Sequence, residues 1–246
     1  MGRFNFALIT DTHCAEQAFW KADSFGTHLD RFYLCIETIN AMEEPPDFIM
    51  LLGDIHLWAI DDFKTDIPIH IIAGNHECGE RKSEMRARFP DDFNLKGEPS
   101  DYYHFIHKGV RFIALCNAGQ GGDHIGHLCS EDINPRGQST WLHAQAHEME
   151  DTKLIFAHTP PAIGGVQGPC DMGLNDSLFF TNLLKETNIT AAFFGHKHLP
   201  RCEFMVGNTS CHILSSCAWN HHDSPLSFCI ATVDDGSVDI NEIVMS

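Results

Sequence analysis

Short runs of apolar residues recur along the chain, and each run ends abruptly in polar residues. Five of these runs cover residues 4–10, 48–52, 67–73, 153–157 and 190–194. Runs of this length with Gly or Pro near their ends are typical of strands that are buried within a sheet. We therefore predict five buried strands.

Stretches with apolar residues at helical spacing lie between these strands. The candidate helices cover residues 29–42, 83–89, 138–149 and 177–186. The first must end before Pro45 and Pro46, because proline cannot continue a helix, and Asp176 or Ser177 is the expected cap of the last. The alternation of strands and helices predicts a layered α/β fold.

Two further regions have the pattern of hairpins. The segments 102–107 and 110–116 are separated by Lys108-Gly109, which predicts a hairpin with a short turn. A second β-rich region begins at Cys202, with breaks expected at Gly207-Asn208 and Asp235-Gly236. No internal repeat, low-complexity tract or long linker interrupts the pattern, so we expect residues 1–246 to form a single domain.

Composition bears on the cellular compartment in which the protein is expected. Ten cysteines are scattered without a Cys-x-x-Cys pair, and the sequence has neither a signal-peptide pattern nor an apolar run of membrane-spanning length. We therefore expect reduced thiols and a cytoplasmic protein that does not enter a membrane. Cys14 and Cys78 are set apart only because they flank polar motifs. The oligomeric state is left open between a monomer and a homodimer.

The charge balance is strongly acidic. Acidic residues outnumber basic ones by 34 to 16, which gives a formal net charge of −18. Affinity for nucleic acids rests largely on Lys and Arg side chains that neutralise phosphates, so a DNA or RNA polymer is not an expected partner. A small anionic substrate remains compatible with this charge, because bound metal ions would make the site locally positive.

Polar side chains that can bind metals follow each of the five predicted strands. Residues just past the carboxyl ends of such strands gather in one crevice, where ligands bind. The chain also has 17 histidines, and histidine is the commonest metal ligand. The residues expected to meet there as metal ligands are Asp11, His13, Asp54, Asn75, His158, His196 and His198.

The chemistry of these seven side chains indicates two metal ions. They offer carboxylate and amide oxygens and imidazole nitrogens but no thiolate, a mixture that suits Mn, Fe or Zn. Seven ligands exceed the needs of one tetrahedral ion and fit two ions that share a bridging carboxylate. Two ions about 3.5–4 Å apart clamp the attacking and leaving oxygens of a displacement at phosphorus and supply hydroxide near neutral pH.

The order of these motifs along the chain is the basis for a resemblance. The calcineurin-like metallophosphoesterase superfamily is similar to this chain in the motifs Asp11-x-His13, Gly53-Asp54, Gly74-Asn75-His76-Glu77, His158 and Gly195-His196-x-His198. The resemblance implies a four-layer αββα sandwich of two mixed β-sheets flanked by helices, with the metals at one end of the sheets. It also implies a hydrolase that cuts a phosphate ester by attack of metal-bound hydroxide.

The resemblance assigns an expected role to each residue. One ion is expected to bind Asp11, His13, Asp54 and His198, and the other is expected to bind Asp54, Asn75, His158 and His196, so that Asp54 bridges the two. His76 matches the histidine that contacts the scissile phosphate in this superfamily. It is the expected catalytic residue, because a histidine can protonate a departing alkoxide near neutral pH.

Finer features bear on the branch of the superfamily. Protein serine/threonine phosphatases carry a Val-Asp-Arg-Gly pattern after Gly-Asp, whereas Ile55-His56-Leu57-Trp58 follows here, which argues against that branch. The class III cyclic-nucleotide phosphodiesterases have segments that look like Gly126-His127-Leu128, Gln138-x-x-Trp141-Leu142 and Ser215-Ser216. We therefore expect a small phosphodiester substrate that resembles a cyclic nucleotide.

Other functions remain as alternatives to this expectation. A phosphomonoesterase or a nucleotide pyrophosphatase would use the same metal core. A non-catalytic scaffold with the same fold is the alternative of another class, but every ligand position and His76 are filled, which favours an enzyme. A nuclease is disfavoured by the acidic charge.

Substrate specificity is expected to lie in two Gly-rich loops, 117–126 and 162–175, since loops on a rigid scaffold commonly carry specificity. Phe19 and Trp20 are left open between stacking on a base and plain packing. Five further residues are left open between contact with substrate, or a place at the rim of the site, and an exposed loop position: His56, His127, Asn175, His221 and His222.

Overall fold

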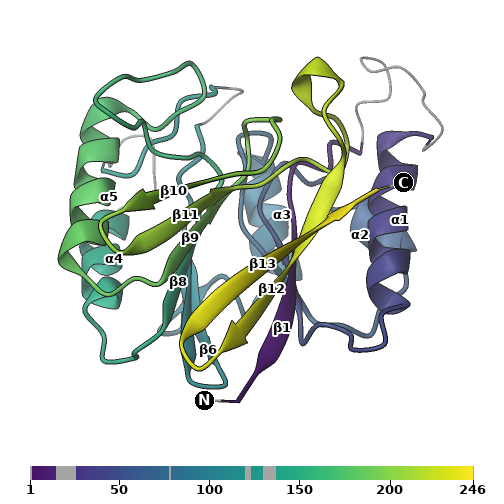
Figure 1. Cartoon of the computed structure of the whole chain (residues 1–246), viewed down its shortest axis with the longest axis horizontal. Coiled ribbons are helices and arrows are strands. Elements are labelled where there is room, and N and C mark those ends of the chain that lie inside the picture. The colour runs from purple at the N-terminus through teal and green to yellow at the C-terminus, as the bar shows by residue number, and fades with distance from the viewer. Residues whose placement is uncertain (1, 15–25, 78, 120–122, 130–136, 246) are drawn as a thin grey trace.

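Two mixed β-sheets pack against each other in the computed structural model shown in Figure 1. It describes residues 2–14, 26–77, 79–119, 123–129 and 137–245. Phe19, Trp20 and Cys78, which were singled out in the sequence, lie outside these ranges.

The five-stranded sheet contains the first three predicted strands. Its order is β13-β12-β1-β2-β3, with bounds Phe4–Ile9 for β1, Ile49–Leu51 for β2, Ile69–Ile71 for β3, Ser227–Asp234 for β12 and Ser237–Val244 for β13. β1, β2 and β3 are parallel, whereas β12 pairs antiparallel with both β1 and β13. The carboxyl ends of β1, β2 and β3 therefore meet at one end of the sheet.

The six-stranded sheet contains the other two predicted strands and the predicted hairpin. Its order is β10-β11-β9-β8-β7-β6, with bounds Tyr103–His107 for β6, Val110–Ala114 for β7, Lys153–Phe156 for β8, Ala191–Phe194 for β9, Cys202–Val206 for β10 and Thr209–Ile213 for β11. The hairpin is β6 and β7. Its turn residues Lys108 and Gly109 have φ of 49° and 83°, as a two-residue type I′ turn requires.

The C-terminal β-rich region divides between the two sheets. β10 and β11 join the six-stranded sheet, and β12 and β13 join the five-stranded sheet. The predicted turns at Gly207-Asn208 and Asp235-Gly236 connect the members of each pair. The segment 214–226 thus leads from one sheet to the other, a division that the pattern of apolar residues did not indicate.

All four predicted helices are present with shifted bounds. The α-helices in the described residues are α1 at His28–Asn40, α2 at Ala59–Asp62, α3 at Glu80–Arg88, α4 at Gln138–Ala146 and α5 at Leu174–Glu186. α1 starts with a capping box, in which Thr27 and Asp30 bond to each other's backbone N–H groups. The short α2, the two-residue strands β4 (Asn94–Leu95) and β5 (Glu98–Pro99), and the 3-10 turn His221–Asp223 were not predicted.

The predicted cap of α5 is wrong. The helix begins at Leu174, and Gly173 precedes it without a side-chain cap. The Asp176 carboxylate instead accepts hydrogen bonds from the backbone N–H groups of Leu128 (2.8 Å) and Cys129 (2.6 Å). Asp176 therefore holds a neighbouring loop, a long-range role that takes precedence over its local preference for a helix end.

Side chains that alternate along the six-stranded sheet define the layers. In β8, Leu154 and Phe156 belong to the core shared with the five-stranded sheet, whereas Ile155 belongs to the core shared with α4 and α5. Phe32 and Ile36 of α1 pack into the first of these cores. Figure 1 accordingly shows α4 and α5 on one flank and α1 and α2 on the other, with both sheets between them. The predicted αββα sandwich is confirmed.

Phenyl rings from both sheets fill the interface between them. The fully buried ring of Phe6 in β1 lies 5.2 Å from Phe48, 5.4 Å from Phe112 and 6.0 Å from Phe156, measured between ring centroids. Aromatic pairs at such distances contribute beyond the area that they bury. These contacts fix one sheet against the other, and hence fix the relative positions of the strand ends that each sheet contributes.

The nine cysteines that the structure describes are all free. None of the helices in the described ranges has the length and apolar character that a membrane span needs.

The replacement Phe6→Ala should lower the free energy of unfolding by about 3–5 kcal/mol, because it leaves a cavity where rings from both sheets meet. Urea denaturation followed by circular dichroism measures this quantity. Ile106→Ala is the control, since Ile106 is 54% exposed and its truncation should change stability by no more than about 0.5 kcal/mol. Equal losses in the two variants would contradict the central role of the phenyl interface.

Candidate metal centre

All seven predicted ligand residues converge where strands of both sheets end. Each of them is 6% exposed or less. The ligand atoms of the six other than Asn75 form overlapping groups in which the atoms lie within 4.8 Å of one another. β1 leads to Asp11 and His13, β2 to Asp54, β3 to Asn75, β8 to His158, and β9 to His196 and His198.

His158 and His196 face each other through nitrogen lone pairs. His158 Nδ1 donates a hydrogen bond to the carbonyl oxygen of Leu52 (2.7 Å), and His196 Nε2 donates to that of His124 (2.8 Å). Since a carbonyl oxygen only accepts, these outer nitrogens carry the hydrogens of the neutral rings. The inner nitrogens, His158 Nε2 and His196 Nδ1, lie 3.1 Å apart. Two lone pairs therefore point at the same place, where a cation would satisfy both.

Asp54 and Asn75 add further acceptors beside this pair. Asp54 Oδ2 lies 3.3 Å from His158 Nε2 and 3.5 Å from His13 Nε2. Its other oxygen, Oδ1, accepts a hydrogen bond from the backbone N–H of His76 (3.0 Å). The amide oxygen of Asn75 lies 3.2 Å from His158 Nε2. One oxygen of Asp54 thus faces histidines on both sides, which is the position that a bridging ligand needs.

Asp11, His13 and His198 form a neighbouring group with the same character. His198 Nδ1 donates to the carbonyl oxygen of Trp219 (2.8 Å), which leaves His198 Nε2 3.1 Å from His13 Nε2 and 3.4 Å from Asp11 Oδ1. Asp11 Oδ2 accepts from the backbone N–H of His196 (2.9 Å), but the buried Oδ1 has no hydrogen-bond partner among the described residues. A buried carboxylate oxygen in this situation is costly unless a cation contacts it.

The spacing of these ligand atoms fits transition-metal ions. Histidine nitrogens bind such ions at about 2.0–2.1 Å, so two nitrogens on one ion lie about 2.9–3.4 Å apart at octahedral or tetrahedral angles. Both nitrogen pairs, His13 with His198 and His158 with His196, are separated by 3.1 Å. The oxygens of Asp11, Asp54 and Asn75 complete a mixed nitrogen and oxygen set that suits Mn, Fe or Zn.

Burial and charge act against each other in the cluster. Burial by itself raises the pKa of the Asp54 carboxyl, but His158 and His13 beside it bring that pKa below its ordinary value. Burial lowers the pKa of His158, yet the Asp54 and Asp11 carboxylates outweigh it and raise the pKa of His158 to about 9. Burial next to His158 lowers the pKa of His196 to about 4. Protons and metal ions therefore compete for His158, and ion binding should weaken as the pH falls.

The turns after the strands have strained backbone. Residues other than glycine rarely adopt positive φ, and such strain gathers at functional sites. Among the described residues with this conformation are five of the seven candidate ligands, Asp11 (54°), His13 (42°), Asp54 (56°), His196 (70°) and His198 (49°). Gly53, with φ of 90°, permits a close approach, since a Cβ there would lie 2.6 Å from both Gly74 N and His158 Nδ1.

His76 lies at the edge of the buried cluster. Its side chain is 30% exposed, whereas that of Asp54 is 2% exposed. His76 Nε2 lies 4.0 Å from Asp54 Oδ2, and its ring packs edge-on against His13 with 4.8 Å between ring centroids. This side chain therefore reaches the cluster on one side and solvent on the other, where a bound substrate would be accessible to it.

Glu77 supports the cluster, a role that the sequence analysis did not assign. Its buried carboxylate accepts hydrogen bonds from the backbone N–H groups of Asp54 (2.7 Å), Ile55 (2.9 Å) and Gly74 (2.9 Å). Burial and the nearby charge of Asp54 raise the pKa of Glu77 to about 8. Glu77 thus joins the turns after β2 and β3. Its place at the end of Gly74-Asn75-His76-Glu77 was the available signal.

Asn117 is a second supporting residue that sequence reasoning missed. Asn117 Oδ1 accepts hydrogen bonds from the N–H groups of His158 (2.9 Å) and Thr159 (3.2 Å), and its Nδ2 donates to the Thr159 carbonyl oxygen (2.7 Å). It therefore fixes the backbone that carries His158. In the sequence Asn117 stands only at the start of a Gly-rich loop, and no local pattern reveals a partner so far along the chain.

The segment between β11 and β12 supports His198. Ser216 Oγ donates to the Asp11 carbonyl oxygen (2.8 Å) and accepts from the N–H groups of Ala218 (2.9 Å) and Trp219 (3.2 Å). The Trp219 ring stacks on His198 with 3.8 Å between centroids. Ser215-Ser216, noted in the sequence as a resemblance, thus has a structural counterpart beside a candidate ligand.

The two Gly-rich loops contact each other near the centre. The Gly126 N–H donates to the Asp171 carbonyl oxygen (3.1 Å), and the Gly173 N–H donates to the Gly126 carbonyl oxygen (2.9 Å). Asp171 also pairs with Lys197 at 2.5 Å, and Lys197 lies between the candidate ligands His196 and His198 in the chain. The second loop is therefore tied to the turn that carries both of these histidines.

The five residues with open roles have different environments. His56 lines a pocket next to the turn after β2. His127 faces Asp123, with 3.4 Å between Nε2 and Oδ2. Asn175 is exposed on α5, and His222 is exposed with φ of 60°. The His221 ring lies edge-on to Trp219, 5.0 Å between centroids, so that it occupies the rim beside His198.

Comparison with known proteins agrees with this geometry. A model of the family described as calcineurin-like phosphoesterase matches residues 4–200, a range that contains all seven candidate ligands and His76.

Two curated relatives are each 27% identical to the chain. One is a probable glycerophosphodiester phosphodiesterase from Arcobacter nitrofigilis, matched over 172 residues that cover 65% of this chain and 58% of the relative. The other is a probable cyclic nucleotide phosphodiesterase from Synechococcus sp., matched over 169 residues that cover 65% of this chain and 60% of the relative. The chain thus spans only about three fifths of the length of these two relatives.

A solved structure has the same fold over nearly the whole length of both chains. The crystal structure of a dimetal phosphatase from Danio rerio superimposes with a TM-score of 0.63 at 16% identity, covering 99% of each chain. At this identity, the likeness concerns the fold alone.

Divalent ions should stabilise the folded chain against heat. A ligand at about 100 times its dissociation constant adds about 2.7 kcal/mol, which for a chain of this size raises the melting temperature by about 5–10 °C. Thermal unfolding followed by circular dichroism, with Mn²⁺ or with EDTA, measures the effect. Asp54→Asn should lose most of the rise, because it removes a carboxylate that faces histidines on both sides.

Asp92→Asn is the matched control for this experiment. Asp92 is also a buried aspartate paired with a histidine, His70, at 2.7 Å, but it is not one of the candidate ligands. Its variant should keep the full rise with Mn²⁺. A rise of the same size in the Asp54 variant would show that the ions bind elsewhere.

Proposed function

This chain belongs to the calcineurin-like phosphoesterase family of metal-dependent hydrolases, and we propose that it hydrolyses a small phosphodiester with the help of two divalent ions. One ion would be held by Asp11, His13, Asp54 and His198, and the other by Asp54, Asn75, His158 and His196. Asp54 would be shared, because its Oδ2 faces both His13 and His158.

One observation carries this proposal. When His158 is neutral, His158 Nε2, His196 Nδ1 and Asp54 Oδ2 are all hydrogen-bond acceptors. In this buried space His196 Nδ1 lies 3.1 Å and Asp54 Oδ2 lies 3.3 Å from His158 Nε2. Acceptors repel one another in such a space unless a positive charge lies among them. The outer nitrogens of both rings already donate to carbonyl oxygens, so the conflict is relieved only by a positive charge among the inner atoms, either a proton on His158 or a metal ion that displaces it.

Bound ions would lower the pKa of a water molecule and neutralise charge that develops on the phosphate. The chain's own contribution is to hold the ligands rigidly. The carbonyl oxygens of Leu52, His124 and Trp219 fix which nitrogen of His158, His196 and His198 points inwards. Such outer partners typically change metal affinity or activity by about 10–100-fold when they are lost.

His76 would donate the proton that the leaving oxygen needs. Its side chain lies at the exposed edge of the cluster, within reach of a substrate whose phosphate contacts the ions. Its N–H group also bonds to Asp54 Oδ1 (3.0 Å), so the backbone position of His76 is coupled to the candidate bridging ligand. The role suits a histidine, because its pKa lies near neutral pH.

A phosphodiester is the preferred substrate class, because two of the curated relatives, each 27% identical, are named as probable phosphodiesterases. A phosphomonoesterase on the same ligands is the competing function. The acidic charge of the chain continues to disfavour a nucleic-acid polymer as substrate. One of the two hydrophobic cores contains residues from both sheets, and we therefore further propose that residues 1–246 act as one domain.

With Mn²⁺, the protein should hydrolyse bis-p-nitrophenyl phosphate with a higher kcat/KM than it shows for p-nitrophenyl phosphate. Release of nitrophenolate measures both rates. Asp54→Asn should lower both rates at least about 100-fold, since losing a ligand should cost more than losing an outer partner. Asp92→Asn should keep them. A higher kcat/KM for the monoester would favour the phosphomonoesterase. Thermal stabilisation by Mn²⁺ without hydrolysis of either ester would favour the scaffold.

A comparison of leaving groups tests the role of His76. Nitrophenolate leaves without a proton, whereas an alkoxide needs one, so His76→Ala should lower kcat about 10²–10⁴-fold for an alkyl diester and much less for bis-p-nitrophenyl phosphate. Steady-state kinetics on the two substrates measure the difference. Equal losses on both substrates would instead assign His76 to positioning the phosphate.

A further inference from the structure

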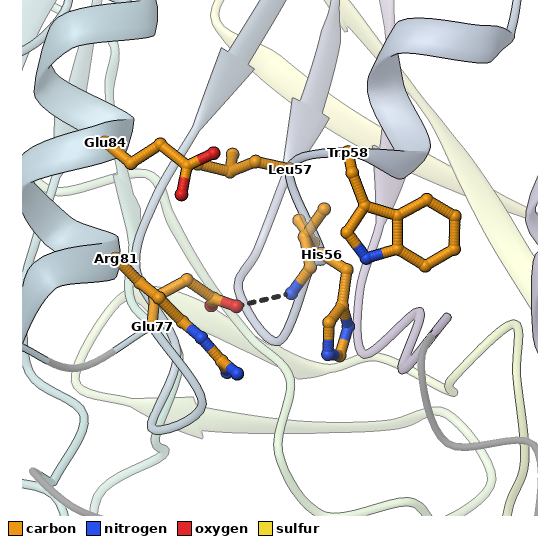
Figure 2. A pocket seen from close by; sticks show the side chains of 7 residues that line it. His56, Leu57, Trp58, Glu77, Arg81 and Glu84 are labelled. Atoms are coloured by element: carbon orange, nitrogen blue, oxygen red, sulfur yellow. Dashed lines mark hydrogen bonds between the residues drawn. The ribbon is translucent and has the colours of Figure 1, made fainter.

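A pocket of about 240 Å³ lies between the start of α2 and the face of α3 (Figure 2). We call it the Trp58 pocket, and it is lined by Ile55, His56, Leu57, Trp58, Glu77, Arg81 and Glu84. Sites for whole small molecules usually occupy about 300–1,000 Å³. The volume therefore suits one group of a substrate whose remainder lies outside the pocket.

Both walls of the Trp58 pocket are joined to the metal centre. On one wall, Ile55 and His56 directly follow Asp54 in the chain. On the other, Arg81 Nη1 donates a hydrogen bond to the carbonyl oxygen of His76 (2.8 Å). The Glu77 carboxylate connects the walls, since it accepts from the N–H groups of Asp54 and Ile55. A substrate with its phosphate at the centre and beside His76 would therefore have this pocket next to it.

The lining residues point to one kind of group. Trp58 is 44% exposed and offers an aromatic face, and its ring centroid lies 6.4 Å from that of His56. In Figure 2 the His56 ring and the Arg81 guanidinium extend towards the same end of the pocket, and the Glu84 carboxylate lies at the other end. The pocket thus combines a surface for stacking with a cationic donor and an anionic acceptor.

These charges discriminate between classes of substrate. Arg81 and Glu84 carry opposite charges, and the third ionisable group, the Glu77 carboxyl, already accepts hydrogen bonds from three backbone N–H groups. The pocket therefore favours an uncharged group that has both donors and acceptors on its edge. An ammonium group in the pocket would be attracted by Glu84 and repelled by Arg81, and a second phosphate would experience the reverse, so neither gains a net attraction from the pair. A nucleobase is planar and uncharged, and it carries donors and acceptors along its edges.

We propose that the Trp58 pocket binds the nucleobase of a nucleoside phosphodiester whose phosphate lies at the metal centre. Trp58 is then a specificity-determining residue, and His56, whose role the sequence left open, belongs to the substrate-binding surface. The inference rests on the proposed function, because it assigns a substrate class to that same centre. A pocket of this kind would favour binding of nucleoside diesters over diesters such as glycerophosphoethanolamine, which have no base to stack.

Kinetics on paired substrates test the proposal. The 246-residue chain with Mn²⁺ is assayed on 3′,5′-cyclic AMP and on glycerophosphoethanolamine. Loss of one stacking contact with a base corresponds to about 5- to 150-fold in affinity. Trp58→Ala should therefore raise KM for the cyclic nucleotide by at least about 5-fold more than for the base-free diester, and Trp58→Phe should restore most of the loss. Met149→Ala truncates a side chain that is 94% exposed outside the pocket, and it should change neither KM.

A binding measurement separates this inference from the proposed function. Calorimetric titration with adenosine, which carries no phosphate, should detect weak binding to the unmodified protein and to Trp58→Phe but not to Trp58→Ala. If neither diester is hydrolysed and adenosine binding still depends on Trp58, the pocket assignment stands and the diesterase function is wrong. If a diester is hydrolysed, but Trp58→Ala affects both substrates equally or leaves adenosine binding unchanged, the pocket assignment is wrong.

Discussion

Carboxylate oxygens and imidazole lone pairs repel one another in a buried space unless a cation lies among them. This constraint governs the end of the molecule where the strands of both sheets stop. His158 Nε2 lies 3.1 Å from His196 Nδ1 and 3.3 Å from Asp54 Oδ2, and each of these three atoms is an acceptor when the His158 ring is neutral. The outer nitrogens of both histidines donate to carbonyl oxygens, which keeps the lone pairs directed inwards. The surrounding turns exist in the form observed because they hold these acceptors together.

The same constraint links the centre to the packing of the two sheets. His158 follows β8 of the six-stranded sheet, yet its ring donates to Leu52, which follows β2 of the five-stranded sheet. The distance between these residues depends on the phenyl rings of Phe6, Phe112 and their neighbours between the sheets. Strain in the turns and packing in the core are therefore two parts of one arrangement. The stability of the core offsets positive φ at ligands such as Asp54.

Sequence predicted the parts of this arrangement that follow local rules. Buried strands are recognisable from short apolar runs, and the rule that polar residues gather past parallel strand ends predicts that Asp11, Asn75 and His196 lie together. Roles that depend on distant partners were not predictable in this way. Asn117 bonds to the backbone at His158, and Asp176 bonds to the backbone of Leu128, which lies 48 residues earlier in the chain. Neither partner is visible from neighbouring residues, and the local preference of Asp176 for a helix cap was misleading.

The contrast between the buried centre and the Trp58 pocket explains why the motifs indicate a reaction but not a substrate. Each candidate ligand is buried and restrained by its turn, and several are held by hydrogen bonds to other strand ends, so replacing one disturbs the whole cluster. The exposed side chains of Trp58, just before α2, and of Glu84 on α3 lie outside the acceptor cluster, and substitutions there leave that cluster intact. Arg81 is the intermediate case, because it faces the pocket and also bonds to the backbone of His76. Substrate preference can therefore change at α2 and α3 while the chemistry of the centre stays the same.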